Sequence, residues 1–460
     1  MAEHEHGARH AAPAHRQDRW PPPPPAPPGP AVPPVPSAPP PSPQAVAPGS
    51  VPAPAQALVT GAGGPPVPTG APPAAPATAP EGAPGGRAGS PPADLPDPPA
   101  RALPSQAVWS TPGDVEGLQA LTVWTEQVPG HGEDAEPFVA HHWGTHQGMV
   151  AVFDGSGGAG AGPVWQAPDG TWHTGAWVGS RVARLATDCW FHEVARETEE
   201  AGPASLHQYL TWFLAKAPQR RSKIGGTMRR QLPTTLAGVH YRVLDHGAAV
   251  ELRPLWAGDS RAYVLSPDSG LHVLTRDHTR ESDALELLRT DPPMTNVVCA
   301  DREFGVDTQV IASFPMPCVL IAATDGWFGY VHTPADFEYL LLSTLRRART
   351  EYEWADLLRR EVQAYTGDDA SLALLALGYR NLAHVREGSE RRYAELRERH
   401  LRGRPRALDR SPRAGAEQTP AGPEDERTAD ARIRAWQEQS WQTYRAGYET
   451  YLPPALEEYR

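Results

Sequence analysis

Apolar side chains with two different periods divide the chain between residues 115 and 379 into predicted helices and strands. Over residues 175–198 and 205–221 they recur at every third or fourth position, which predicts two amphipathic helices. Short apolar runs rich in β-branched residues follow at 235–244, 249–258, 261–267 and 270–276 and predict strands. The sequence "SPDSG" between the last two runs is typical of a hairpin turn.

Later in the chain, the run "CVLIAATDG" at 318–326 predicts a buried strand that ends on an aspartate. Helices are predicted over 333–348 and 351–366, the first with Thr333 as its N-cap and Pro334 at its first helical position. A final strand is predicted at 370–379. This order of elements favours an α+β fold, an antiparallel sheet with helices packed outside it.

The N-terminal part of the chain has a different composition. Residues 1–112 are rich in Pro, Ala and Gly, and 34 of the 54 prolines precede Gly113. Such a segment has too little bulky apolar surface to offset the entropy of ordering it, so we expect a disordered tail with polyproline II character. Its first residues, "MAEHEHGARH", lack the apolar stretch of a secretory signal.

Composition also divides the chain after the predicted folded domain at 113–380. Residues 381–402 are rich in Arg and Glu and predict a charged helix, and residues 403–427 are rich in Pro and Gly, as in a linker. Residues 428–460 predict an aromatic-rich helix, with Trp436, Trp441, Tyr444, Tyr448 and Tyr451 among charged residues. We expect this helix to dock on the main domain or on a partner, the alternative being a loose, solvated helix.

Charge and cysteine content exclude several classes of protein. A net charge of −12 and a pI near 5.8 argue against a general nucleic-acid binder. The sequence has no run of about 18 apolar residues, so no membrane-spanning helix is predicted. Cys189, Cys299 and Cys318 lie far apart without CxxC spacing, which argues against a disulfide framework and a structural zinc site and fits a reducing cytoplasm.

The candidate chemistry begins with "AVFDGSGGAGAG" at 151–162, where an apolar run ends on Asp154 and continues into glycines. The stretch fits a phosphate cradle, a metal site or a plain flexible loop. Acids stand at strand edges in three other segments as well. The full set is Glu133, Asp134, Asp154, Asp325, Asp368 and Asp369. Hard cations such as Mg²⁺ and Mn²⁺ prefer several oxygen ligands, so together these acids favour a metal cluster.

Seven motifs in order resemble the metal-dependent type 2C protein phosphatase (PPM) family over residues 118–379. They are "GEDA", "VFDGSGG", "PTTLAGV", "LWAGDSRAYVL", "LTRDHT", "LIAATDGWFGYV" and "GDDASLALLAL". The resemblance implies a four-layer α-β-β-α sandwich, in which two antiparallel sheets are flanked by helices. It also implies a site for two Mn²⁺ or Mg²⁺ ions at one end of the sandwich.

The resemblance further implies a role for each acid. Asp154 resembles the carboxylate that bridges two metals, and Gly155 the residue that binds metal through its carbonyl. Glu133, Asp325 and Asp368 match further metal ligands, while Asp134 matches the acid that holds metal-bound water. Asp369 is expected to support these ligands, and Asp259 resembles an acid near a candidate third metal.

The sequence departs from the family pattern at two places that concern substrate binding. Pro129 stands where the family has an arginine that grips the phosphate. His131 and Arg181 are candidate replacements, and the alternative for each is a structural or solvated role. Residues 159–174 are predicted to be an inserted hairpin around "PDG", which either shapes access to the site or is a passive surface loop.

The sequence therefore predicts a cytoplasmic bacterial serine/threonine phosphoprotein phosphatase that hydrolyses its substrate with a two-metal-activated water. Its expected partner is a phosphorylated protein, the target of a bacterial serine/threonine kinase. Because of Pro129, the alternative is a pseudophosphatase that binds phosphoproteins as a scaffold. In that case the Pro-rich N-terminus or the C-terminal helix would recruit partners.

Overall fold

The computed structural model describes residues 107–112, 117–218, 230–244, 247–290, 292–405, 408 and 423–454. Most of the segment predicted to be disordered, and most of the predicted linker at 403–427, lie outside these residues. Among the described residues, no helix combines the length and the apolar character needed to cross a bilayer.

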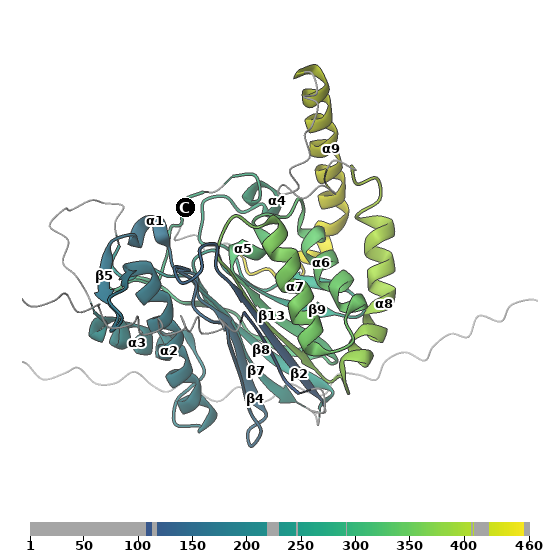
Figure 1. The fold of residues 1–460 in the computed structure, drawn as a ribbon. Coiled ribbons are helices and arrows are strands. Elements are labelled where there is room, and N and C mark those ends of the chain that lie inside the picture. Colours follow the sequence, from purple (N-terminus) through teal and green to yellow (C-terminus); the bar gives the residue numbers. More distant parts are fainter. Residues whose placement is uncertain are drawn as a thin grey trace, which may run out of the picture. The chain divides into compact units, whose positions relative to one another are not determined.

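Two antiparallel sheets form the centre of the fold (Figure 1). The first has the order β1 (Val108–Ser110), β2 (Leu118–Thr125), β14 (Ala370–Leu377), β13 (Cys318–Ala323), β9 (Arg261–Ser266) and β10 (Gly270–Val273). The second has the order β11 (Asp307–Thr308), β8 (Ala249–Ala257), β7 (Leu236–Leu244), β4 (Gln147–Val152) and β3 (Phe138–His142), with β12 (Ile311–Pro315) also paired to β8. A separate hairpin is made of β5 (Pro163–Gln166) and β6 (Trp172–Thr174).

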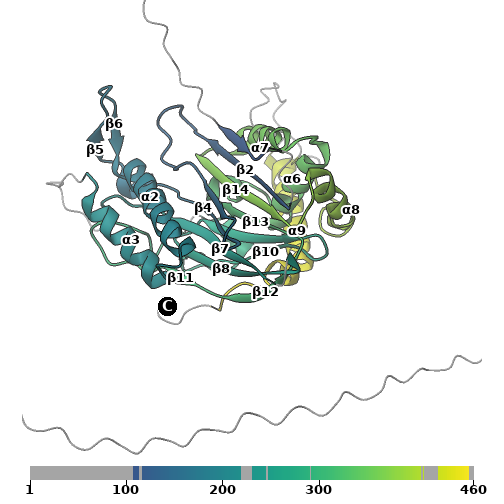
Figure 2. The same cartoon turned by 90° about the horizontal axis from the view of Figure 1, so that it is seen from below.

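Helices cover the outer face of each sheet (Figure 2). On the second sheet lie α2 (Gly175–Ala195) and α3 (Pro203–Lys216). On the first lie α6 (Pro334–Arg347), α7 (Glu351–Tyr365) and α9 (Pro423–Tyr448), with α8 (Leu382–Arg399) packed on α6. The remaining helices are single turns: α1 (Gly157–Gly160), α4 (Ala284–Leu287) and α5 (Asp325–Phe328). The predicted four-layer α-β-β-α architecture is confirmed.

Burial explains why the central strands have continuous apolar runs. Every residue of β4, β13 and β14 is buried, because one face of each strand meets the other sheet and the opposite face meets helices. The sheets are joined by an apolar layer that includes Val150, Val239, Leu320 and Leu375. The two helical layers bury separate clusters against the outer faces.

Local signals at helix and turn positions are confirmed. Thr333 caps α6 in a capping box with Asp336, and Pro334 is its first residue. The "SPDSG" turn joins β9 to β10, and the 159–174 insertion contains the β5–β6 hairpin. One boundary differs: β1 lies inside the segment predicted to be disordered, because Val108 pairs with Val123 of β2 at the edge of the first sheet.

The C-terminal helix docks on its own domain. Trp436, Trp441, Tyr444 and Tyr448 are buried, so the aromatic face of α9 is covered in the folded chain. The carbonyl of Gly447 lies 2.6 Å from Nδ1 of His272 in β10, which fixes the end of the helix on the sheet. In the described part of the chain, this aromatic face is therefore not exposed for a partner.

A buried histidine in the second sheet predicts a pH dependence of stability. His240 in β7 is 2% exposed, and its Nε2 lies 3.1 Å from Oε1 of Gln147. Burial, with smaller contributions from the charges of Arg253 and Arg242, lowers its pKa to about 3. Since an unfolded histidine has a pKa near 6.5, the unfolded state binds a proton first as the pH falls, and stability drops between about pH 6.5 and pH 3.

We therefore expect the free energy of unfolding of the wild type to fall by about 2 kcal/mol more than that of a His240→Gln variant between pH 6.5 and pH 5. Urea unfolding at both pH values measures the difference. An equal fall in the two proteins would show that His240 is not the titrating group.

Candidate metal centre

Asp154 follows the buried strand β4, and its backbone is held on both sides. Its carbonyl accepts hydrogen bonds from the Thr235 amide and the Thr234 hydroxyl, both at 2.7 Å. The next residue must be very small, because a Cβ on Gly155 would lie 2.6 Å from the Glu133 carbonyl oxygen and 2.7 Å from that of Ala176. The Asp-Gly pair is therefore fixed in position while the Asp154 side chain remains partly exposed.

Glu133 and Asp134 lie in the loop between β2 and β3, which is tied to the start of β14. The Asp369 carboxylate accepts the amide N–H groups of Gln127, at 2.8 Å, and of Glu133, at 2.6 Å. Thr174 donates a hydrogen bond to Oε1 of Glu133, and Thr324 donates to Oδ2 of the buried Asp134 at 3.0 Å. Asp369 therefore holds the loop that carries both acids.

Asp325 and Asp368 are brought together by the pairing of β13 with β14. Thr324, which precedes Asp325, donates its amide to the Ser371 carbonyl at 3.0 Å, and its hydroxyl accepts the Ser371 amide at 2.9 Å. These two hydrogen bonds join the end of β13 to the start of β14, so Asp325 and Asp368 lie at the same end of this strand pair. Asp368 is exposed, whereas Asp325 is partly buried.

The pKa values indicate that these acids share one region. Burial raises the pKa of Asp154 well above its usual range, and Asp134, Asp325, Asp259 and Asp368 raise it further by repulsion. Burial likewise raises the pKa of Asp134, with added repulsion from Asp369 and Asp325. Carboxylates from separate segments therefore converge, and their charges destabilise one another.

The pKa values of Asp259 and Glu133 are raised as well. Burial raises the pKa of Asp259, and repulsion from Asp325 and Asp277 adds to it. Its Oδ1 is buried and has no hydrogen-bond partner. Burial also raises the pKa of Glu133, against the lowering effect of its Thr174 hydrogen bond. Mutually repelling oxygens with an unpartnered atom among them fit a cation, so the donor set suits Mg²⁺ or Mn²⁺.

The carboxylates of these acids do not form a metal coordination shell in the described part of the chain. Across the described ranges, no three His, Cys, Asp or Glu side chains surround one point closely enough to hold an ion. Electrostatic coupling reaches farther than a metal–ligand bond, so the acids occupy one region without standing at ligand distances.

Of the two candidate phosphate-binding residues, Arg181 is already engaged. Its guanidinium donates to the carbonyls of Gly132, at 3.2 Å, and Trp177, also at 3.2 Å, and it stacks 3.9 Å from the Trp177 ring centroid. Burial lowers its pKa to about 10. Arg181 therefore supports the Glu133 loop, while Pro129 and His131 are exposed nearby in the sequence.

Comparisons with known proteins concern the fold. No family model and no curated protein matches the chain. Among solved structures, the Mycobacterium tuberculosis serine/threonine phosphatase PstP/Ppp is similar at 16% identity and a TM-score of 0.39, over 57% of this chain and 99% of that one. The neighbours are PPM-type serine/threonine phosphatases, the family that the motifs resemble.

Two more solved phosphatases are similar to this chain, at comparable identities and TM-scores. The PPM Ser-Thr phosphatase MsPP from Mycobacterium smegmatis, solved with cacodylate, is 16% identical with a TM-score of 0.37, over 57% of this chain and 100% of that chain. The PstP catalytic domain, solved with two manganese ions, is 17% identical with a TM-score of 0.36, over 56% and 98%. At these identities the similarity concerns the fold alone, so the chemistry must be argued from the residues of this chain.

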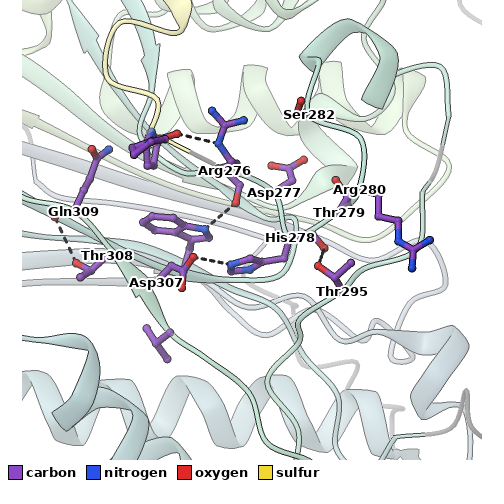
Figure 3. Close-up of a pocket in the computed structure, with 14 residues that line it drawn as sticks. Arg276, Asp277, His278, Thr279, Arg280, Ser282, Thr295, Asp307, Thr308 and Gln309 are labelled. Carbon is purple, nitrogen blue, oxygen red and sulfur yellow. Dashed lines mark hydrogen bonds and ion pairs between the residues drawn. The ribbon is translucent and has the colours of Figure 1, made fainter. Parts of the chain in front are cut away.

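A cavity of about 850 Å³ lies elsewhere, between the 276–282 loop and the 306–309 strand region (Figure 3). Both of its carboxylates have partners within the protein: Asp277 binds Arg261 at 2.7 Å, and Asp307 lies 3.0 Å from Nε2 of His278. It contains none of the predicted metal ligands. Its link to them is indirect, because Nδ1 of His278 accepts the amide N–H of Gly258, the neighbour of Asp259, at 2.9 Å.

Several residues that shape the centre were not identified as functional from the sequence. Thr174, Thr234, Thr235 and Thr324 hold the acids or their backbone by hydrogen bonds. The motif "PTTLAGV" contains two of them, but a threonine at a strand end is equally common as an ordinary β-forming residue. Their partners come from distant segments, which the sequence does not reveal.

Proposed function

We propose that this protein is a metal-dependent serine/threonine phosphoprotein phosphatase. The observation that supports the proposal is the convergence of acids on Asp154, whose pKa is raised by burial and by repulsion from Asp134, Asp325, Asp259 and Asp368. Uncompensated repulsion of this kind costs stability, and active sites are where proteins retain it.

In this proposal, Asp154, the Gly155 carbonyl, Glu133, Asp325 and Asp368 hold two Mn²⁺ or Mg²⁺ ions, and Asp259 holds a candidate third. When bound, such ions supply a water that is nucleophilic at neutral pH and positive charge for the phosphoryl oxygens. Asp134, buried and bonded to Thr324, orients that water as a proton acceptor. Thr174 keeps the Glu133 carboxylate in one orientation.

The experiment is the hydrolysis of 4-nitrophenyl phosphate and of a phosphothreonine peptide by the full chain, with Mn²⁺, with Mg²⁺ and with EDTA. We expect turnover that needs the metal, stops with EDTA and returns when Mn²⁺ is added back. A folded sample that binds Mn²⁺ but turns over neither substrate would contradict the proposal.

A second candidate function is a pseudophosphatase that binds phosphoproteins as a scaffold. It is favoured by Pro129, which has no charge, and by Arg181, whose guanidinium is bonded to backbone carbonyls. Loss of one bidentate arginine contact costs about 2–4 kcal/mol, which slows an enzyme without abolishing its activity. Binding of the phosphopeptide without hydrolysis would favour this candidate.

A further inference from the structure

A stack of flat side chains lies beside the candidate metal centre. It consists of Trp165 in β5, His173 in β6, Trp177 and Arg181 in α2, and Trp124 in β2, and we call it the aromatic stack. The ring centroids of Trp165 and His173 are 5.4 Å apart, and those of His173 and Trp177 are 3.8 Å apart, with interplanar angles of 24° and 25°. The Arg181 guanidinium continues the stack, 3.9 Å from the Trp177 ring and 5.7 Å from the Trp124 ring.

The inserted hairpin builds the outer part of this stack. Trp165 and His173 come from its two strands, which lie against the N-terminal end of α2 (Figure 2). Both rings are partly exposed, as is that of Trp177, and Trp172 on the same hairpin is 49% exposed. The inserted hairpin therefore adds aromatic side chains that are partly exposed to solvent and not fully buried in a core.

Hydrogen bonds join the aromatic stack directly to Glu133. Thr174, the residue after His173, donates to the Glu133 carboxylate and accepts the Trp177 amide N–H at 3.1 Å. Arg181, which stacks on Trp177, donates to the carbonyls of Gly132 and Glu133, at 3.2 and 3.4 Å. Thr174 and Arg181 therefore join the aromatic stack to the loop that carries Glu133, a proposed metal ligand.

Pro129 offers no side-chain donor to a substrate phosphate, and Arg181 donates from Nη1 and Nη2 to backbone carbonyls. Contacts with the rest of the substrate therefore add binding energy that supports the reaction at the phosphorus. Parallel rings at a partly exposed surface bind another aromatic ring by offset stacking.

We propose that the aromatic stack makes this protein selective for phosphopeptides with an aromatic side chain beside the phosphoserine or phosphothreonine. The inference rests on the proposed phosphatase function and names its substrate class. Trp165 is the specificity-determining residue that the structure makes easiest to test, because it lies on the inserted hairpin and makes no side-chain hydrogen bond to the metal-centre acids.

The test uses two phosphothreonine peptides that differ only in the residue after the phosphothreonine, Trp or Ala. For each, kcat/KM and the binding affinity are measured with the wild type, Trp165→Ala, Trp165→Phe and the control Trp212→Ala. Trp212 is 59% exposed on α3, outside the stack. We expect the wild type to prefer the Trp peptide by about five- to tenfold. The preference should fall below about twofold in Trp165→Ala and persist in Trp165→Phe and in the control.

The outcomes separate this inference from the function on which it rests. Metal-dependent turnover with equal kcat/KM for the two peptides in the wild type would overturn the inference and leave the phosphatase proposal intact. Absence of all metal-dependent turnover would contradict the phosphatase proposal. The affinities would then still decide whether the stack selects an aromatic peptide. A preference that survives in Trp165→Ala would also overturn the inference.

Discussion

Asp154→Asn is expected to lower metal-dependent hydrolysis of 4-nitrophenyl phosphate by about a thousandfold. The amide keeps the shape of the side chain but removes the charge that would bridge two ions, and several kcal/mol of charge stabilisation depend on those ions. Without metal, the same variant should be more stable than the wild type, by on the order of 1 kcal/mol, because Asp154 no longer repels Asp134 and Asp325.

Activity assays with Mn²⁺ and thermal unfolding in EDTA measure the two effects in one preparation. Asp268→Asn is the matched control, since this exposed aspartate pairs with Arg391 at the surface and should change neither quantity appreciably. Retention of more than about a tenth of the activity in Asp154→Asn would remove Asp154 from the centre. A loss of both activity and stability would instead indicate a structural role.

The fold was predictable because its signals are local. Alternating periods separated strands from helices, and Thr333 with Pro334 marked the start of α6. The candidate acids stand at the ends of buried strands: Asp325 and Asp368 flank the paired strands β13 and β14, whereas Asp154 follows β4 of the other sheet, which packs against both. The sequence pattern was therefore sufficient to predict that residues lie close together where they flank strands that are paired in one sheet.

The supporting contacts were not predictable, because they depend on partners far away in the sequence. Arg181 was a candidate phosphate-binding residue, but its guanidinium donates to carbonyls of the Glu133 loop, 48 and 49 residues away. β1 lies in a segment whose composition predicts disorder, and its three residues are ordered by pairing with β2. The aromatic residues of the C-terminal helix predicted burial, but their period does not identify the surface that covers them.

Loss of Glu338 is expected to lower the free energy of unfolding by about 3–5 kcal/mol in Glu338→Ala. Glu338 of α6 is fully buried and joins three helices. It accepts two hydrogen bonds from Arg392 of α8, at 2.7 and 2.9 Å, and one from the Tyr444 hydroxyl of α9 at 2.6 Å. Removal of the carboxylate would leave the Arg392 charge buried without its main partner, which is the costly way to break such a pair.

Because Tyr444 loses its acceptor at the same time, the C-terminal helix should become more susceptible to proteolysis before the rest of the domain unfolds. Urea unfolding and limited trypsin digestion measure the two consequences. Glu390→Ala is the control: Glu390 pairs with Arg346 at 2.9 Å, but both side chains are exposed, so its loss should cost less than about 1 kcal/mol. Glu338→Gln keeps the shape and an acceptor oxygen and should fall between the two. Equal costs for Glu338→Ala and Glu390→Ala would mean that the network does not fasten α9 to the domain.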